Sequence, residues 1–372
     1  MIYLDYQATT PLAPEVAAAI RPWLETNFGN PHSPHRLGRE AAAAIEVARG
    51  QVQRCLGEAD GRFYFTSGAT EAANWALKGS AARLPADRRR IVTLATEHAC
   101  VLDTVEWLAE QGYEADILPV QPDGLIDLDL AAARIDDRTG LVAAMLVNNE
   151  IGVIQPVEEI AGLAHARGAL FFCGAVQGLG RVAIPLHACD MVAASAHKVH
   201  GPKGIGGRWV RDGVALDPLP HGGGQEGGIR SGTLSPALCV GFGEGGRLLV
   251  ERREEGRAHV ARLWETARQA LQGWTLNGSF EQRYRGKLNI RADRVDAARL
   301  ISELRTVALS AGSACATGSG RPSHVLRALG PTEREARSSI RLGFGRYTTE
   351  DELMHALDLI LDATARQRSF AA

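Results

Sequence analysis

Four lysines occur in this arginine-rich chain of 372 residues, and one of them, Lys198, follows the apolar segment 190–195. Ser195, His197 and the glycine-rich stretch 201–207 surround it. A lysine at the mouth of a buried strand is partly desolvated, which favours a neutral amine that can attack carbonyl groups. Hydroxyl, imidazole and N–H groups nearby suit the phosphate of an aldehyde cofactor. The pattern predicts a pyridoxal phosphate (PLP) enzyme, and the simpler alternative is a solvated lysine at a strand end.

A second polar turn, Thr-Ser-Gly-Ala-Thr-Glu at residues 66–71, follows an expected strand and opens an expected helix. Glycine allows a tight turn there, and free N–H groups at a helix start attract phosphate. Most such turns are only helix caps. Beside Lys198, however, the turn becomes a candidate phosphate site, with Thr70, Ser195 and His197 as donors.

His98 and the pair Asn148-Asn149 each follow an expected strand. At the carboxyl end of a strand, a histidine can stack on a ring or move protons, although a lone histidine is more often structural. The amides could bind a cofactor oxygen or a substrate carboxylate, and a simple turn explains them equally well.

Cys315 and Arg341 complete the candidate set. Cys315 lies among small residues and glycines in the segment 310–322, so we expect an accessible thiol, whereas the other five cysteines occur in apolar or helical contexts that suggest buried, inert thiols. A cysteine on a flexible loop suits a nucleophile that travels between a substrate and a partner. Arg341 lies on an apolar strand, where it needs an anion: either an amino-acid carboxylate or an internal ion pair.

The elements that must position these residues alternate between helix and strand. We expect helices at 14–25 and 39–56 and from about 71, and strands at 62–65, 90–94, 140–148 and 169–173. This order predicts an α/β fold with a mostly parallel sheet, which places ligands at the carboxyl ends of its strands. Beyond it we expect one or two long helices over 237–270, strands at 287–291 and 339–342, and helices at 297–304 and 350–365. We therefore predict a large domain, 14–251, and a smaller α+β domain formed by 1–13 and 252–372.

Composition narrows the class of protein. A net charge of −2 argues against nucleic acid or an anionic membrane as partner, and no segment has the ~18 apolar residues of a membrane span. The N-terminus lacks a signal-peptide pattern. Six cysteines without a CxxC pair favour neither disulfides nor zinc, so we expect a cytoplasmic protein without a bound metal.

Taken in order, these residues resemble the cysteine desulfurases of the NifS and IscS type, a branch of the class-V aminotransferase superfamily. The matching segments are 3–6, 8–11, 29–31, 67–71, 97–98, 148–152, 195–198, 222–226, 230–234, 310–322, 322–327 and 345–349. Together they cover nearly the whole chain.

The resemblance implies a PLP enzyme of fold type I that acts as a homodimer on L-cysteine. Lys198 would hold the cofactor and move the substrate α-proton, and His98 would stack on the ring. Asn149 and Gln177 would bind cofactor and substrate oxygens. Thr70, Ser195 and His197, with Thr233 from the other subunit, would hold the phosphate. Arg341 would bind the cysteine carboxylate. Cys315 would take the sulfur as a persulfide for an iron–sulfur scaffold or another sulfur acceptor, on a loop that resembles the longer type in this family.

One position departs from the family pattern. The family reads Asp-Ala-Val-Gln, whereas this chain has Gly174 before Ala-Val-Gln177. In the family that aspartate keeps the pyridine nitrogen protonated, so its loss should weaken the electron sink, and losing such a group typically costs on the order of 10²–10³-fold in rate. Two smaller departures are Gly227, where an arginine is usual, and the short sequence after Ser369; both bear on the partner more than on the chemistry.

Gly174 leaves two other functions open beside a cysteine desulfurase. The chain could be a PLP-binding paralogue with little intrinsic activity and a regulatory or partner-dependent role. It could also be a related lyase that acts on selenocysteine or cysteine sulfinate, although a thiol such as Cys315 argues against that reading.

Overall fold

The computed structural model describes residues 1–312 and 323–370. Among them, a seven-stranded sheet forms the centre of the larger part of the molecule. Its strand order is β2 (Gly61–Thr66), β8 (Gly206–Arg211), β7 (Met191–Ser195), β6 (Leu170–Gly174), β5 (Thr139–Met145), β3 (Arg90–Leu94) and β4 (Glu114–Leu118). Only β8 runs antiparallel to its neighbours, so the sheet is mostly parallel as predicted.

Helices cover both faces of this sheet, and alternate strand residues divide between them. In β6, Phe172 packs with helices α3 (Ala69–Ala81) and α4 (Ala99–Glu110). Its neighbours Phe171 and Cys173 pack on the opposite face. That face is covered by α2 (Arg36–Leu56), α5 (Leu128–Arg134), α6 (Val157–Ala166) and α7 (Pro236–Glu251), and α1 (Pro14–Glu25) lies along α7. Burial on both faces explains why these strands are nearly continuous apolar runs.

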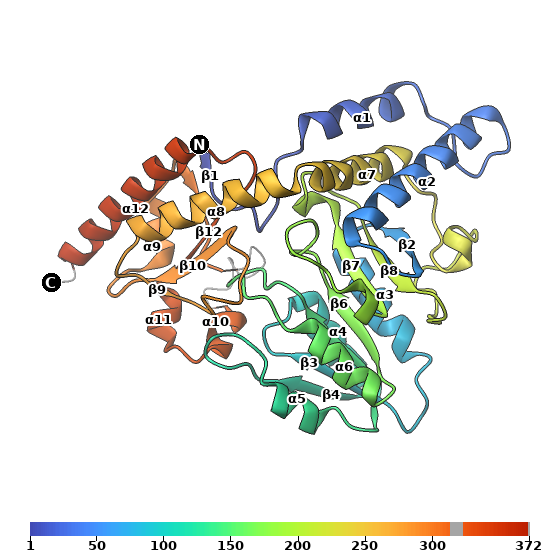
Figure 1. Cartoon of the computed structure of the whole chain (residues 1–372), viewed down its shortest axis with the longest axis horizontal. Coiled ribbons are helices and arrows are strands. Elements are labelled where there is room, and N and C mark those ends of the chain that lie inside the picture. Colours follow the sequence, from blue (N-terminus) through green and yellow to red (C-terminus); the bar gives the residue numbers. More distant parts are fainter. Residues whose placement is uncertain (313–322, 371–372) are drawn as a thin grey trace.

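A second, separate core lies in the remainder of the chain. Its sheet has the order β12 (Ser339–Gly343), β10 (Lys287–Arg291), β9 (Thr275–Leu276), and β1 (Ile2–Tyr3) pairs with β11 (Val307–Ala308). The helices are α8 (Arg253–Ala270), α9 (Ala297–Glu303), α10 (His324–Ala328), α11 (Glu333–Arg337) and α12 (Glu350–Phe370). In Figure 1, α7 and α8 run end to end from one part to the other, and the N-terminal strand lies beside the orange and red elements. The boundaries 13/14 and 251/252 stay a prediction.

Most predicted elements occur within a few residues of the expected positions. The strand expected at 140–148 is an exception, because β5 ends at Met145. Beyond it, the Asn148 side chain accepts hydrogen bonds from the N–H groups of Glu150 (2.8 Å) and Ile151 (3.0 Å), which turns the chain. None of the helices in the described ranges is long and apolar enough to cross a membrane.

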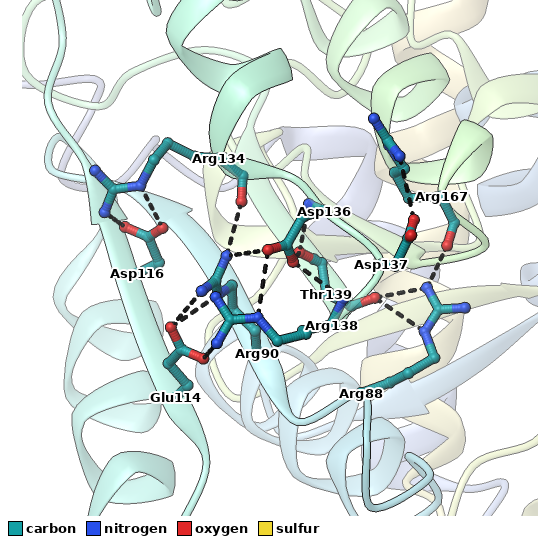
Figure 2. A network of polar contacts seen from close by, with 10 residues as sticks. All are labelled: Arg88, Arg90, Glu114, Asp116, Arg134, Asp136, Asp137, Arg138, Thr139 and Arg167. Carbon is teal, nitrogen blue, oxygen red and sulfur yellow. Dashed lines mark hydrogen bonds and ion pairs between the residues drawn. The ribbon is translucent and has the colours of Figure 1, made fainter.

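A network of ion pairs closes the edge of the large sheet where β3, β4 and β5 begin (Figure 2). Arg90 binds Glu114 at 2.6 Å and Asp136 at 2.8 Å, and Arg138 binds the same two carboxylates. Arg134 pairs with Asp116 at 2.6 Å. These charges lie at the amino ends of the strands, so they stabilise the edge opposite to the one where the predicted site residues gather.

Candidate active site

A cavity of about 680 Å³ opens at the carboxyl ends of the parallel strands. It is lined by residues that follow β3, β5, β6 and β7, by the start of α3 and by the N-terminal segment 7–9. Eight of the predicted residues line it: Thr70, His98, Asn149, Gln177, Ser195, His197, Lys198 and Arg341. The sequence argument that strand ends converge on one site is therefore confirmed in geometry, while the role of each residue stays a prediction.

Lys198 ends the single 3-10 turn Ala196–Lys198 that follows β7. Its Nζ donates hydrogen bonds to the main-chain oxygens of Gln7 (2.6 Å) and Ala8 (2.7 Å). The N-terminal segment thus holds the amine inside the cavity, where it can meet a carbonyl group. No local sequence signal singled out residues 7–9 for this task, since their contact with Lys198 spans about half of the chain.

The expected phosphate donors lie together at one end of the cavity. Thr70 is in the first turn of α3, whose N-cap, Gly68, provides no side-chain cap. Ser195 is buried at the end of β7, and burial together with the nearby Lys198 lowers the pKa of His197 to about 4. His197 is therefore neutral at pH 7 and can donate one hydrogen bond. Gly206 permits the close approach of β8 to this turn, because a Cβ on it would lie 2.8 Å from the Cα of Gly68.

His98 is the N-cap of α4, and its Nδ1 accepts a hydrogen bond from the Cys100 N–H at 3.1 Å. Burial and the neighbouring Lys198 lower the pKa of His98. A neutral ring with Nδ1 as acceptor carries its proton on Nε2.

Glu97 was not predicted as a site residue, yet it lines the same cavity and is 2% exposed. Burial raises its pKa to about 7, although the N–H groups of His98 and Met145 donate to the carboxylate. From the sequence we selected its neighbour His98 and found no signal for Glu97. Only burial in the folded chain distinguishes Glu97 from an ordinary glutamate.

The two asparagines have different tasks. Asn148 shapes the turn after β5, whereas Asn149 lines the cavity, and its Oδ1 has no hydrogen-bond partner among the described residues. Gln177 is already engaged: its Nε2 donates to the Gln7 oxygen at 3.0 Å, and its Oε1 accepts from Arg181 at 3.1 Å. Asn149 is thus the better placed of the predicted amides to accept a ligand donor.

Arg341 is 1% exposed and already has an anion. Its Nη2 lies 2.8 Å from the Asp5 carboxylate, and its Nη1 donates to the Asn149 oxygen at 3.1 Å. Nε has no partner in the described ranges. The internal ion pair that the sequence left open is thus present, and Arg341 still lines the cavity with its Nε–H uncommitted.

Three further predictions concern residues outside this group. Cys315 lies outside the described residues. Thr233 is exposed and does not line the cavity. Four of the other cysteines are buried as expected: Cys55, Cys173, Cys189 and Cys239. The prediction of a buried thiol is wrong for Cys100, which is only partly buried and lines the cavity.

Gly174 ends β6 and lines the cavity floor. The nearest atoms to a Cβ at this position would be Cα and Cβ of Met145, both at 3.4 Å. A Cβ at this position would therefore make only ordinary van der Waals contacts.

The residues fit PLP. An amine for its aldehyde (Lys198), hydroxyl donors beside an uncapped helix start for its phosphate, and an unpartnered amide oxygen (Asn149) all face one cavity. A Cβ on Gly68 would meet nothing within 4 Å, so the backbone there lies open to a ligand.

Comparison with known proteins agrees with this geometry. The profile described as aminotransferase class-V matches residues 2–355. A protein named cysteine desulfurase IscS from Rickettsia bellii (strain OSU 85-389) is 42% identical over 379 aligned positions, which cover 100% of this chain and 92% of that protein.

Two solved structures are similar along their length. A NifS-like protein has a TM-score of 0.91 at 32% identity and covers 98% of this chain and 99% of its own. The structure described as SspA in complex with cysteine has a TM-score of 0.82 at 34% identity and covers 94% of this chain and 100% of its own.

Fold and site together define a PLP enzyme of the α/β type. The chain belongs to the class-V aminotransferase family, and within it to the cysteine desulfurases. These comparisons favour the desulfurase function over the regulatory paralogue and over the related lyases.

Proposed function

We propose that the chain converts L-cysteine to L-alanine and transfers the sulfur to Cys315 as a persulfide. The observation that carries the proposal is the convergence of Lys198, His98 and Arg341 with the hydroxyl donors in one cavity. The match of this chain to a cysteine desulfurase over its whole length supports L-cysteine as the substrate.

The predicted site residues have the following proposed tasks. PLP, when bound, supplies an electron sink for the pair left by the departing α-proton. Lys198 binds the cofactor and moves that proton. His98 offers its Nε2 proton and a ring face, and Thr70, Ser195 and His197 donate to the phosphate. Arg341 draws the substrate carboxylate toward the Asn149 turn, where its Nε remains to donate.

The sulfur step is balanced in electrons between the two thiols, with PLP, when bound, as the electron sink. The Cys315 thiolate attacks the sulfur of the substrate, an S–S bond forms and the C–S bond breaks. The carbon keeps the bonding pair and takes a proton to become the methyl group of alanine. Cysteine and the enzyme thiol thus give alanine and an enzyme persulfide without an external oxidant or reductant.

The test measures alanine and protein-bound persulfide from L-cysteine, with the chain as it is and with Cys315→Ser. We expect persulfide to disappear and turnover to fall by at least about 10²-fold when the nucleophile is removed. Cys100→Ser is the matched control, because Cys100 also lines the cavity. Unchanged sulfide release by Cys315→Ser would contradict the sulfur path.

We further propose a cytoplasmic homodimer with Thr233 completing the phosphate site of the partner, and a scaffold or acceptor protein that receives the sulfur. Thr233 lies outside the cavity of its own chain, and Leu24 and Phe28 are 71% and 81% exposed, as expected of a surface awaiting a partner. Cys55, Cys173, Cys189 and Cys239 form no disulfide in the described part of the chain, which fits a reducing compartment. Sedimentation analysis of the protein and of Phe28→Asp tests the dimer; a monomer that retains full activity would contradict it.

A further inference from the structure

A second, smaller cavity of about 60 Å³ lies between the two parts of the chain, next to Lys198 but separate from the site above. Residues 180–181 and 198–200 of the larger part form one wall, and the start of α8 forms another. Residues 344–346, after β12, close it from the smaller part. Arg252 joins α7 to α8 here, so the cavity lies where the two parts are connected.

The lining of this cavity is basic. The cationic residues are Arg181, Arg252, Arg253, Arg257 and Arg346, and the lining includes no described aspartate or glutamate; Lys198 also lines it, but its amine lies in the main cavity. His200 also lines it, but burial lowers its pKa to about 4, so it is neutral at pH 7.

Few of these charges are compensated. Arg252 pairs with Glu15 at 2.7 Å. Within residues 1–312 and 323–370, the other four arginines of the lining form no ion pair with a carboxylate. Glu254 and Glu255 occupy the first turn of α8 but do not line the cavity. Arg253 and Arg257 are exposed, so water screens part of the repulsion among these guanidinium groups, and an anion between them would offset the rest.

Arg181 is partly buried, and desolvation lowers the pKa of its guanidinium. It donates to Gln177 Oε1 at 3.1 Å and to the Lys198 oxygen at 2.5 Å, and it lies 5.6 Å from the ring centre of Tyr284. All of these partners are neutral groups. A partly desolvated guanidinium whose partners are all neutral is stabilised further by an anion on this side.

We propose that this cavity binds a tetrahedral oxyanion of the phosphate or sulfate type. The donors come from three separate segments, the turn at Arg181, helix α8 and the segment at Arg346, which suits an anion with several oxygens. The volume of about 60 Å³ is several times the ~10–15 Å³ of probe-occupied volume that one water needs, so a small oxyanion, free or at the end of a larger molecule, can enter.

Binding would join the two parts of the chain. Arg181 and Arg346 belong to different parts, and Arg181 also holds the main-chain oxygen of Lys198. An anion shared by these arginines stabilises their relative placement and thereby the position of the lysine. The inference does not depend on the proposed function, since it concerns binding and stability alone.

The experiment uses PLP-loaded protein, so that an added oxyanion cannot enter the phosphate end of the main cavity. Sulfate and inorganic phosphate are titrated with the melting temperature and heat of binding as readouts, against chloride at matched ionic strength. We expect a saturable rise in melting temperature with sulfate and phosphate, and none with chloride.

Variants locate the site. Arg257→Ala and Arg253→Ala should each weaken binding by about tenfold, since each removes a charge-assisted partner. Arg262→Ala is the matched control, because Arg262 is exposed on the same helix and does not line the cavity. Arg257→Glu supplies a built-in anion, so it should raise the melting temperature without sulfate and abolish the response to it.

Two results would overturn the proposal. One is a rise in melting temperature that depends on ionic strength alone. The other is a rise with sulfate or phosphate that is unchanged in Arg253→Ala and Arg257→Ala. A final titration compares ADP with inorganic phosphate to identify the source of the anion. If ADP binds more tightly, with the same dependence on Arg253 and Arg257, the ligand is the phosphoryl group of a larger molecule. If phosphate binds more tightly, the ligand is the free ion.

Discussion

Lys198 donates hydrogen bonds from Nζ to the main-chain oxygens of Gln7 and Ala8, at 2.6 Å and 2.7 Å. The same Gln7 oxygen accepts from Gln177 at 3.0 Å. The first residues of the chain therefore position the amine and one of the amides in the cavity. A segment outside the large sheet thus controls the geometry at the ends of its strands.

Removal of Lys198 should abolish cofactor attachment. In Lys198→Ala we expect PLP to be lost on dialysis and alanine formation to fall by at least about 10³-fold, because no other amine replaces it at the end of β7. Absorbance of the bound cofactor and mass spectrometry after borohydride reduction identify the modified residue.

Lys203→Ala is the control, since Lys203 is the other lysine of the cavity lining. It should keep its cofactor on Lys198. Reductive labelling of Lys203 in the unaltered protein would contradict the assignment.

Gly174→Asp should raise the rate. The nearest atoms to a new Cβ lie at 3.4 Å, so a Cβ is accommodated there, and we expect from the family resemblance that a carboxylate at this position would lie beside the pyridine nitrogen. If that carboxylate is what the chain lacks, alanine formation should increase by roughly 10²-fold. Steady-state rates with L-cysteine and the melting temperature are compared for both proteins.

Gly174→Asn is the control, because asparagine has nearly the shape of aspartate without its charge. It should leave the rate of alanine formation low. Brisk turnover by the unaltered chain, with no gain from aspartate, would mean that another group supports the ring nitrogen.

Glu97 makes stability depend on pH. Its pKa is about 7 in the folded chain, above the ordinary value of 4.5, because of burial. Between these two values the folded state holds a proton that the unfolded state has lost. Stability therefore falls as pH rises through this window, by at most about 1.4 kcal/mol per pH unit.

Glu97→Gln should remove that slope, so its gain in melting temperature over the unaltered chain should be larger at about pH 8 than at about pH 5. The lowered pKa values of His197 and His200 make stability fall as pH drops below the ordinary histidine pKa of 6.5. Both histidines are present in the two proteins, so their effect cancels when the melting temperatures are subtracted. Glu106→Gln, exposed on α4, controls for the lost charge. Equal gains at both pH values would contradict a buried, protonated Glu97.

The sequence predicted what depends on local pattern. The strand at 90–94 was found because a strand buried on both faces is an apolar run, and Lys198, His98 and Asn149 were found because they follow such strands. It did not predict the contact between Lys198 and Gln7 or the basic cavity around Arg181. Those depend on segments that are distant in the chain and meet only once the two parts pack, so no local pattern marks them.

The ion-pair network of Figure 2 allows a direct comparison of a buried and an exposed arginine with the same partners. Arg90 and Arg138 both bind Glu114 and Asp136, but their side chains are 9% and 60% exposed. Glu114 and Asp136 are 49% and 38% exposed, so water can solvate them after either loss. Loss of Arg90 also removes a packed side chain and its hydrogen bond to the Arg134 main-chain oxygen at the start of β3. Arg90→Ala should therefore lower the free energy of unfolding by about 1–2 kcal/mol and Arg138→Ala by less than about 1 kcal/mol. Urea unfolding of the PLP-loaded protein measures both. Equal losses would show that burial of Arg90 adds nothing to the pairs it makes, and that this edge of the sheet is held by its strands alone.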